Sequence, residues 1–261
     1  MKGPALVLHQ FRAEQRRFWR NPAAVFFTVL FPVMFLFIFA SIFGNDTIEL
    51  PGTGTEVKVS TYYVPGIMTL AIVSATLVNL AIGLTFDRES GILKRVRMTP
   101  LPAGAFIAGR IGNCLVISAV MMVVVTGIGA VVYGVEVPWS KLPALVIVLV
   151  VAAVSFCSLG FALTALIPNE DAAPPIANVA VFPLYFLSGV FIPESELSSG
   201  MLDFAGIFPI RHLMIAIVSP FDPGVTGTGI EGGDLAIVAI WGALGFAAAV
   251  RWFRWAPQSH N

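Results

Sequence analysis

Six long apolar runs constrain the fold of this 261-residue chain more than any other feature of its sequence. A helix needs about 20 apolar residues to cross the roughly 30 Å hydrocarbon core of a bilayer. Because the runs are continuous rather than alternating, they predict transmembrane helices and not the strands of a membrane barrel. The predicted spans cover residues 22–44, 62–86, 104–133, 142–167, 172–192 and 235–255.

The composition of the chain agrees with a lipid environment. Hydrophobic residues make up 57% and charged residues 11% of the chain, whereas soluble domains contain about 45–50% and about 25%. A soluble domain of this length could not cover so much apolar surface with polar groups. We therefore predict an all-α membrane protein with six transmembrane helices.

The distribution of Lys and Arg predicts how the chain is oriented. With six spans, twelve of these residues fall on one side of the membrane and only Lys58, Lys141 and Arg211 fall on the other. Because cytoplasmic loops are enriched in Lys and Arg, both termini are expected in the cytoplasm. Residues 256–261 would form a short cytoplasmic tail, and Arg110 would reach the interface from the inner start of the third span.

The N-terminal segment, residues 1–21, has the pattern of an amphipathic helix. Arg12, Arg16 and Arg20 recur every four residues and share one side, while Leu8 and Phe11 add apolar area. Such a helix is expected to lie in the inner headgroup plane, with its arginines on lipid phosphates. A charge cluster that only sets the topology remains the alternative.

The segment 197–219 is apolar enough to suggest a seventh crossing, but it carries groups that are disruptive at the bilayer centre. These groups are Asp203, Pro209, Arg211 and His212. A seventh crossing would also move the two arginines near the C-terminus to the outer side. We therefore expect a re-entrant or interfacial helical hairpin on the outer side, covered by protein where its backbone is irregular.

The cytoplasmic loop 87–102 (DRESGILKRVRMTPLP) mixes six charges with an apolar stripe. Ile92, Leu93 and Val96 have the spacing of one face of a short helix, which the prolines after Met98 would end. This pattern predicts a docking surface for a soluble partner. A solvated loop that only obeys the charge rule remains open.

Four motifs in this sequence resemble a known family. Glu89–Leu101 (ESGILKRVRMTPL) resembles the E-x-G-T-L-x-R-L-x-x-T-P-L loop of ABC-2-type permeases, the membrane subunits of bacterial ATP-binding-cassette exporters that include the daunorubicin-resistance-like group. Tyr63–Ile67 (YVPGI), Phe182–Pro193 (FPLYFLSGVFIP) and Phe208–His212 (FPIRH) are similar to three further family motifs, in the same order. Ile92 and Phe208 replace the usual Thr and Asn.

The resemblance implies a fold and a set of contacts. The fold would be that of the short-helix exporters in the bacterial plasma membrane, with an N-terminal connecting helix, a cytoplasmic coupling helix and outer re-entrant helices at Pro209, Arg211 and His212. The implied partners are a nucleotide-binding ATPase subunit, a second copy or a sister permease, and membrane lipids. The residues that would couple to the ATPase subunit are Arg88, Glu89, Gly91, Leu93, Lys94, Arg95, Val96 and Arg97.

The sequence also predicts where the driving force originates. The chain has no G-x-x-x-x-G-K-S/T phosphate loop, and the apolar cores of its spans carry no ionisable side chain that could bind a proton or sodium ion. We therefore expect a permease subunit rather than an enzyme, with ATP and Mg²⁺ bound by its partner. No cofactor, metal site or nucleic-acid partner is expected for this chain.

The residues of a transport pathway are the least determined by the sequence. Asn79 and Asn178 are predicted to be buried amides near mid-span, where hydrogen bonds between helices are favoured over substrate contact. Phe35, in the Phe-rich first span, could belong to an apolar gate. The leading hypothesis is an exporter of amphipathic drug-like or lipid-type molecules. The alternative is a passive channel or membrane scaffold without an ATP-driven cycle.

Overall fold

The computed structural model describes residues 3–43, 46–50 and 55–256. Lys2, Gly44 and the predicted tail beyond Ala256 lie outside the described residues. The elements, in chain order, are α1 (Gly3–Trp19), α2 (Pro22–Val25), the π-helical turn η1 (Phe26–Leu30), α3 (Phe31–Phe43), β1 (Thr47–Glu49), β2 (Glu56–Lys58), α4 (Val59–Val73), the π-helical turn η2 (Ser74–Val78), α5 (Asn79–Glu89), α6 (Ile92–Arg97), α7 (Ala103–Tyr133), η3 (Trp139–Lys141), α8 (Leu142–Thr164), α9 (Ala173–Leu187), η4 (Glu194–Glu196), α10 (Ser199–Ala205), α11 (Pro209–Phe221) and α12 (Gly232–Trp252).

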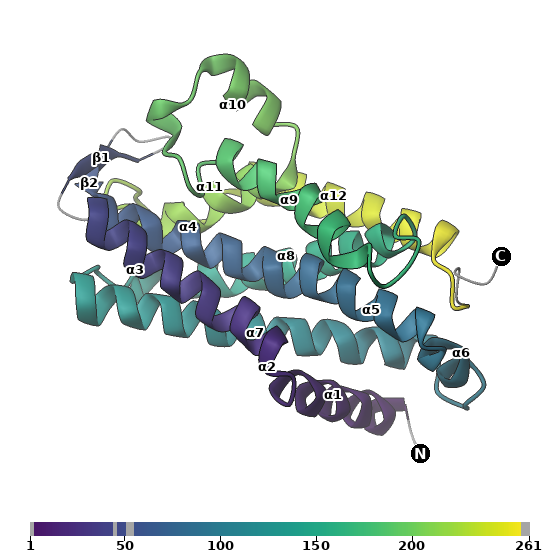
Figure 1. Cartoon of the computed structure of the whole chain (residues 1–261). Helices are drawn as coiled ribbons and strands as arrows, with labels where there is room; N and C mark the ends of the chain where they lie inside the picture. Colours follow the sequence, from purple (N-terminus) through teal and green to yellow (C-terminus); the bar gives the residue numbers. More distant parts are fainter. Residues whose placement is uncertain (1–2, 44–45, 51–54, 257–261) are drawn as a thin grey trace.

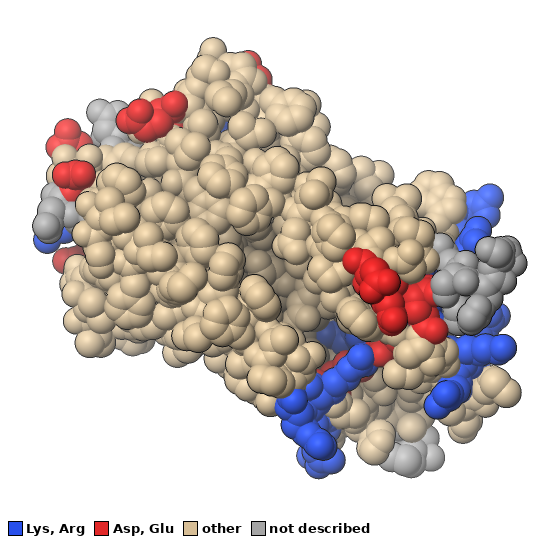
Figure 2. Space-filling view, viewed as in Figure 1, with Lys and Arg blue, Asp and Glu red and all other residues tan. Residues whose placement is uncertain are grey.

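The long helices confirm an all-α, multi-pass membrane protein. Within the described residues, five helical segments are long and apolar enough to span a bilayer. Charged side chains gather at the two ends of the molecule, with an almost uncharged band between them on the face in Figure 2. The helix α1 and the end of α12 lie at the same end of the molecule (Figure 1). The five segments are Pro22–Phe43, Val59–Glu89, Ala103–Tyr133, Trp139–Thr164 and Gly232–Trp252.

The predicted span 172–192 is only partly helical, which corrects the prediction. Its helix α9 has 15 residues, or about 22 Å at 1.5 Å per residue, which is shorter than the hydrocarbon core. The chain then continues as buried irregular backbone. Tyr62 donates its hydroxyl to the Gly189 carbonyl, and the Tyr63 hydroxyl lies 3.3 Å from the Phe191 carbonyl. These bonds satisfy backbone groups that could not face lipid.

The segment after α9 forms the helical pair that the sequence suggested. The axes of α10 and α11 differ by 98°, and Pro209 occupies the first turn of α11, where its missing N–H breaks no helical bond. The Lys141 ammonium donates to the carbonyl of Asp222, just past α11, at 2.9 Å. Since Lys141 immediately precedes α8, the end of α11 lies at the start of α8.

Two polar side chains of this pair, both on α11, have partners on neighbouring segments. Arg211 makes two hydrogen bonds to the Glu194 carboxylate, at 2.9 and 3.1 Å. The Nδ1 atom of His212 lies 2.6 Å from the Asp234 carboxylate at the start of α12. These contacts explain how Arg211 and His212 are tolerated next to the membrane-spanning helices.

Candidate functional site

The short helix α6 presents a basic face to the surroundings at the α1 end of the bundle. Ile92 is 40% and Met98 81% exposed, and three basic side chains between them are also exposed: Lys94, Arg95 and Arg97. Leu93 is fully buried, and Val96 packs against the same apolar cluster as Leu93. The apolar stripe predicted from the sequence therefore does not form a single exposed face. Leu93 and Val96 pack against the bundle, whereas Ile92 faces outward.

The turn before α6 depends on Gly91, whose φ of +71° places it in the left-handed region. We expect Gly91→Ala to cost about 1–2 kcal/mol, since a Cβ is strained in that conformation. The matched control is Gly104→Ala, because Gly104 is helical in α7 and a Cβ there would meet nothing within 4 Å. Thermal unfolding in detergent measures both. Equal melting temperatures for the two variants would contradict the requirement for glycine at position 91.

Arg88 does not belong to the exposed face, which corrects the predicted docking set. The helix α5 continues through Glu89 rather than ending before the loop, so Arg88 points into the bundle and is fully buried. Its guanidinium donates to the carbonyls of Thr164 and Ile167 at 2.8 and 2.6 Å, and to Glu89 at 2.6 Å. Arg88 therefore fastens α5, next to α6, to the end of α8.

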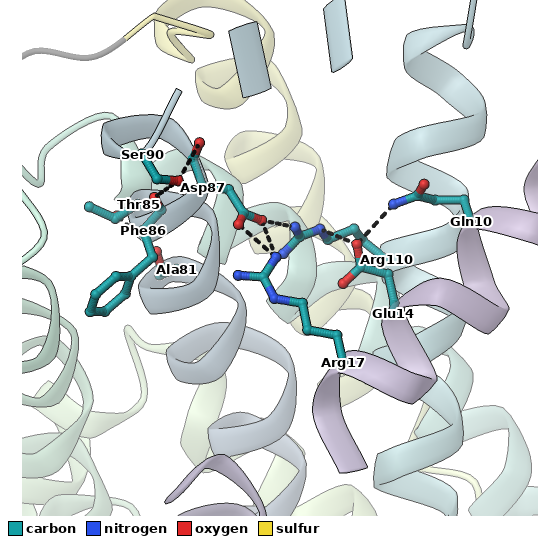
Figure 3. A network of polar contacts seen from close by, with 9 residues as sticks. All are labelled: Gln10, Glu14, Arg17, Ala81, Thr85, Phe86, Asp87, Ser90 and Arg110. Carbon is teal, nitrogen blue, oxygen red and sulfur yellow. Dashed lines mark hydrogen bonds and ion pairs between the residues drawn. The ribbon is translucent and has the colours of Figure 1, made fainter. Parts of the chain in front are cut away.

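Asp87, one residue earlier, is the centre of a buried ion-pair network (Figure 3). Its carboxylate accepts from Arg17 of α1 at 2.6 Å and from Arg110 of α7. The Nε atom of Arg110 in turn lies 3.2 Å from Glu14 of α1. The hydrogen bond to Asp87 raises the pKa of Arg17. Two carboxylates thus balance two guanidiniums where three helices meet.

The network corrects the expectation for Arg110, which does not reach the interface alone but is buried among these partners. A close approach of α1 and α7 makes this possible. A Cβ at Gly109 would lie 2.6 Å from Cγ of Gln10, and the Gln10 amide donates to Glu14 at 2.8 Å. On the other side of α1, three arginines predicted to contact lipid are exposed: Arg12, Arg16 and Arg20.

A cavity of about 700 Å³ adjoins the network and opens between α1, α3, α5 and α9. Both π-helical turns, η1 and η2, contribute to its wall, and such turns are frequent at functional sites. The Asn79 amide donates to Thr28, another residue of the cavity wall, at 3.3 Å. Oδ1 of Asn113 is buried and has no hydrogen-bond partner among the described residues. The cavity therefore offers an unused acceptor in a largely apolar wall.

Asn178 also lines this cavity, but it is exposed rather than buried as predicted. Its amide donates to the Pro174 carbonyl of its own helix at 2.8 Å. The reason is the position of α9, which presents this face to the open cavity instead of to another helix.

Phe35 belongs to an aromatic cluster next to the cavity. Its ring centroid lies 5.4 Å from that of Phe191 and 4.7 Å from that of Phe31. Phe31 lines the cavity, and so does Phe182. The ring centroid of Phe182 lies 6.1 Å from that of Phe191. The cavity thus combines aromatic walls with amide and hydroxyl groups.

Comparison with known proteins gives one family and several relatives. A family model described as ABC-2 type transporter matches residues 6–221. The chain is 20% identical to the putative transport permease YvfS of Bacillus subtilis (strain 168), over 77% of this chain and 79% of the relative. It is 23% identical to the daunorubicin resistance ABC transporter permease protein DrrB1 of Streptomyces coeruleorubidus, over 81% and 73%. It is 26% identical to the putative transport permease ycf38 of Porphyra purpurea, over 76% and 68%.

Proposed function

Since this chain belongs to the ABC-2 type transporter family and is the membrane subunit of an ABC transporter, we propose that it forms part of an export pathway driven by a separate ATPase subunit. Two copies, or one copy and a sister permease, would dock on two ATPase subunits that bind ATP and Mg²⁺. The observation that carries this proposal is the exposed basic face of α6, which follows α5 and its buried Asp87 after a turn of two residues.

The connections of α6 make it suited to transmit force. Leu93 anchors it in the apolar cluster that includes Phe106 of α7, and Arg88 fastens the preceding helix to α8. Movement of a docked partner would therefore shift α5, α7 and α8 together rather than bend a loose loop. Such a shift could change which side of the membrane the pathway faces, provided that the partner binds the two states with different affinity.

The cavity lined by Asn79, Asn113 and Asn178 supports an amphipathic cargo. Its volume of about 700 Å³ lies within the range of about 300–1,000 Å³ that is typical of ligand pockets. Such pockets are mostly apolar and carry a small number of precisely placed polar groups. A daunorubicin resistance permease among the relatives agrees with a drug-like cargo. The proposed orientation places α6 and both termini in the cytoplasm of a bacterium, following the distribution of Lys and Arg.

The docking proposal predicts the effect of neutralising α6. We expect Lys94→Ala/Arg95→Ala to weaken binding of the ATPase subunit about tenfold, because two charges at the rim of an interface are removed. Both side chains are exposed, so insertion and melting temperature should be unchanged. The matched control is Arg12→Ala/Arg16→Ala, which removes the same charge from α1. Retained ATPase binding and export in the α6 variant would count against the docking role.

A further inference from the structure

A second cavity, which shares Val181 with the one beside the ion-pair network, lies between α8, α9, α11 and α12. It has a volume of about 910 Å³ and is lined by residues of α8, α9 and α12. Leu159 and Leu163 of α8, Leu184 of α9 and Ala248 of α12 contribute to its apolar wall. Because α8 and α12 are membrane-spanning helices, the groove suits hydrocarbon chains.

The length of the groove corresponds to one leaflet of a bilayer. One end is closed by Phe208 and Trp241, whose rings stack with centroids 6.1 Å apart, and the Trp241 indole donates to the Ile207 carbonyl at 2.9 Å. Arg251 and Arg254 line the other end. Ten residues of α12 separate Trp241 from Arg251, or about 15 Å of helix, which is half of the roughly 30 Å core.

The basic end of the groove is held in place by the chain that follows α12. The ring of Phe253 packs on Phe161 at 5.7 Å, and that of Trp255 packs on Phe106 at 5.8 Å. Arg254 therefore lies between two anchored aromatic residues. Among the described residues, neither Arg251 nor Arg254 forms an ion pair with a carboxylate. Two positive charges thus stand at the mouth of an apolar groove.

We propose that this groove binds an anionic phospholipid of the leaflet at the C-terminal end of α12, with its acyl chains along α8 and α12 and its phosphate at Arg251 and Arg254. Basic sites at the headgroup level between transmembrane helices favour anionic lipids. A zwitterionic lipid would make the same apolar contacts without the net charge. A second protein copy on this face would bury two unpaired guanidiniums, which is unfavourable.

Native mass spectrometry of the full chain, released from nanodiscs with equal phosphatidylglycerol and phosphatidylcholine, tests the proposal. We expect about 30-fold preferential retention of phosphatidylglycerol, from two arginines at the membrane surface. Arg251→Gln/Arg254→Gln should reduce this preference toward parity. Ala248→Phe should reduce retention of both lipids without changing the charge. Lys94→Gln/Arg95→Gln removes the same charge away from the groove and should keep the preference.

Several results would contradict the proposal that the groove binds an anionic phospholipid. Equal retention of the two lipids by the unaltered chain would do so, and so would an unchanged preference in Arg251→Gln/Arg254→Gln. Disulfide-linked dimers of Ala248→Cys in native membranes would show that a second copy covers the groove. The native cysteines Cys114 and Cys157 are buried, so we do not expect them to contribute to disulfide-linked dimers.

Discussion

Replacing Asp87 with Ala is expected to destabilise the protein by about 3–5 kcal/mol, one of the two largest effects among the substitutions considered. It breaks a buried ion pair and leaves the guanidiniums of Arg17 and Arg110 with the single carboxylate of Glu14. Asp87 is fully buried, and Arg110, its partner in α7, is 6% exposed. Arg17 is half exposed and can turn to water, so most of the loss comes from Arg110. Thermal unfolding in detergent, followed by Trp fluorescence, measures the effect.

A double-mutant cycle tests whether this loss of stability comes from the ion pair of Asp87 and Arg110 or from the substitution at Asp87 alone. Arg110→Met removes the buried guanidinium, so Asp87→Ala/Arg110→Met should be less destabilised than the sum of the two single variants. Asp171→Ala, which removes an exposed carboxylate, should stay within about 0.5 kcal/mol of the unaltered chain. Strictly additive losses for Asp87 and Arg110 would show that the ion pair contributes nothing.

Replacing Arg88 with Met is expected to have an effect of similar size, about 3–6 kcal/mol. The substitution removes two hydrogen bonds from a charged donor, each contributing about 1.5–3 kcal/mol, and leaves the carbonyls of Thr164 and Ile167 without this partner. Arg88→Lys should recover only part of the loss, because a compact ammonium does not reproduce the fork that reaches both oxygens. The melting temperature and the fraction recovered by gel filtration measure both variants.

The control for Arg88 is Arg97→Met, since Arg97 is exposed on the adjacent helix. It removes the same side chain from a site without buried partners, so we expect a change within about 0.5 kcal/mol. A small effect of Arg88→Met, equal to that of Arg97→Met, would mean that the junction between α5 and α8 does not depend on this guanidinium.

The membrane fold was predictable because hydropathy is a local property of the sequence. The long apolar runs and the charged segment around Pro209 required no knowledge of distant contacts. The end of α9 was not predictable, because residues 172–192 are apolar throughout, and hydropathy reports burial in lipid or protein rather than helical backbone. The bonds from Tyr62 and Tyr63 that allow the irregular stretch join residues more than a hundred positions apart.

The candidate site was predictable only in its exposed half. Lys94 and Arg95 lie on the surface of α6, as the loop pattern suggested. Asp87 and Arg88 were misplaced because charge was taken as a sign of exposure to water. Their burial depends on partners that a linear pattern cannot provide, since Arg17 and Arg110 are 70 and 23 positions from Asp87.

The most direct test of the central claim is purification of this chain from its native membrane in mild detergent, followed by mass spectrometry and an ATPase assay. We expect that an ATPase with a phosphate loop is recovered with the chain and shows vanadate-sensitive turnover. Repeated recovery of the chain without an ATPase, under conditions that keep a control ABC transporter intact, would contradict the account and favour a passive channel or a membrane scaffold.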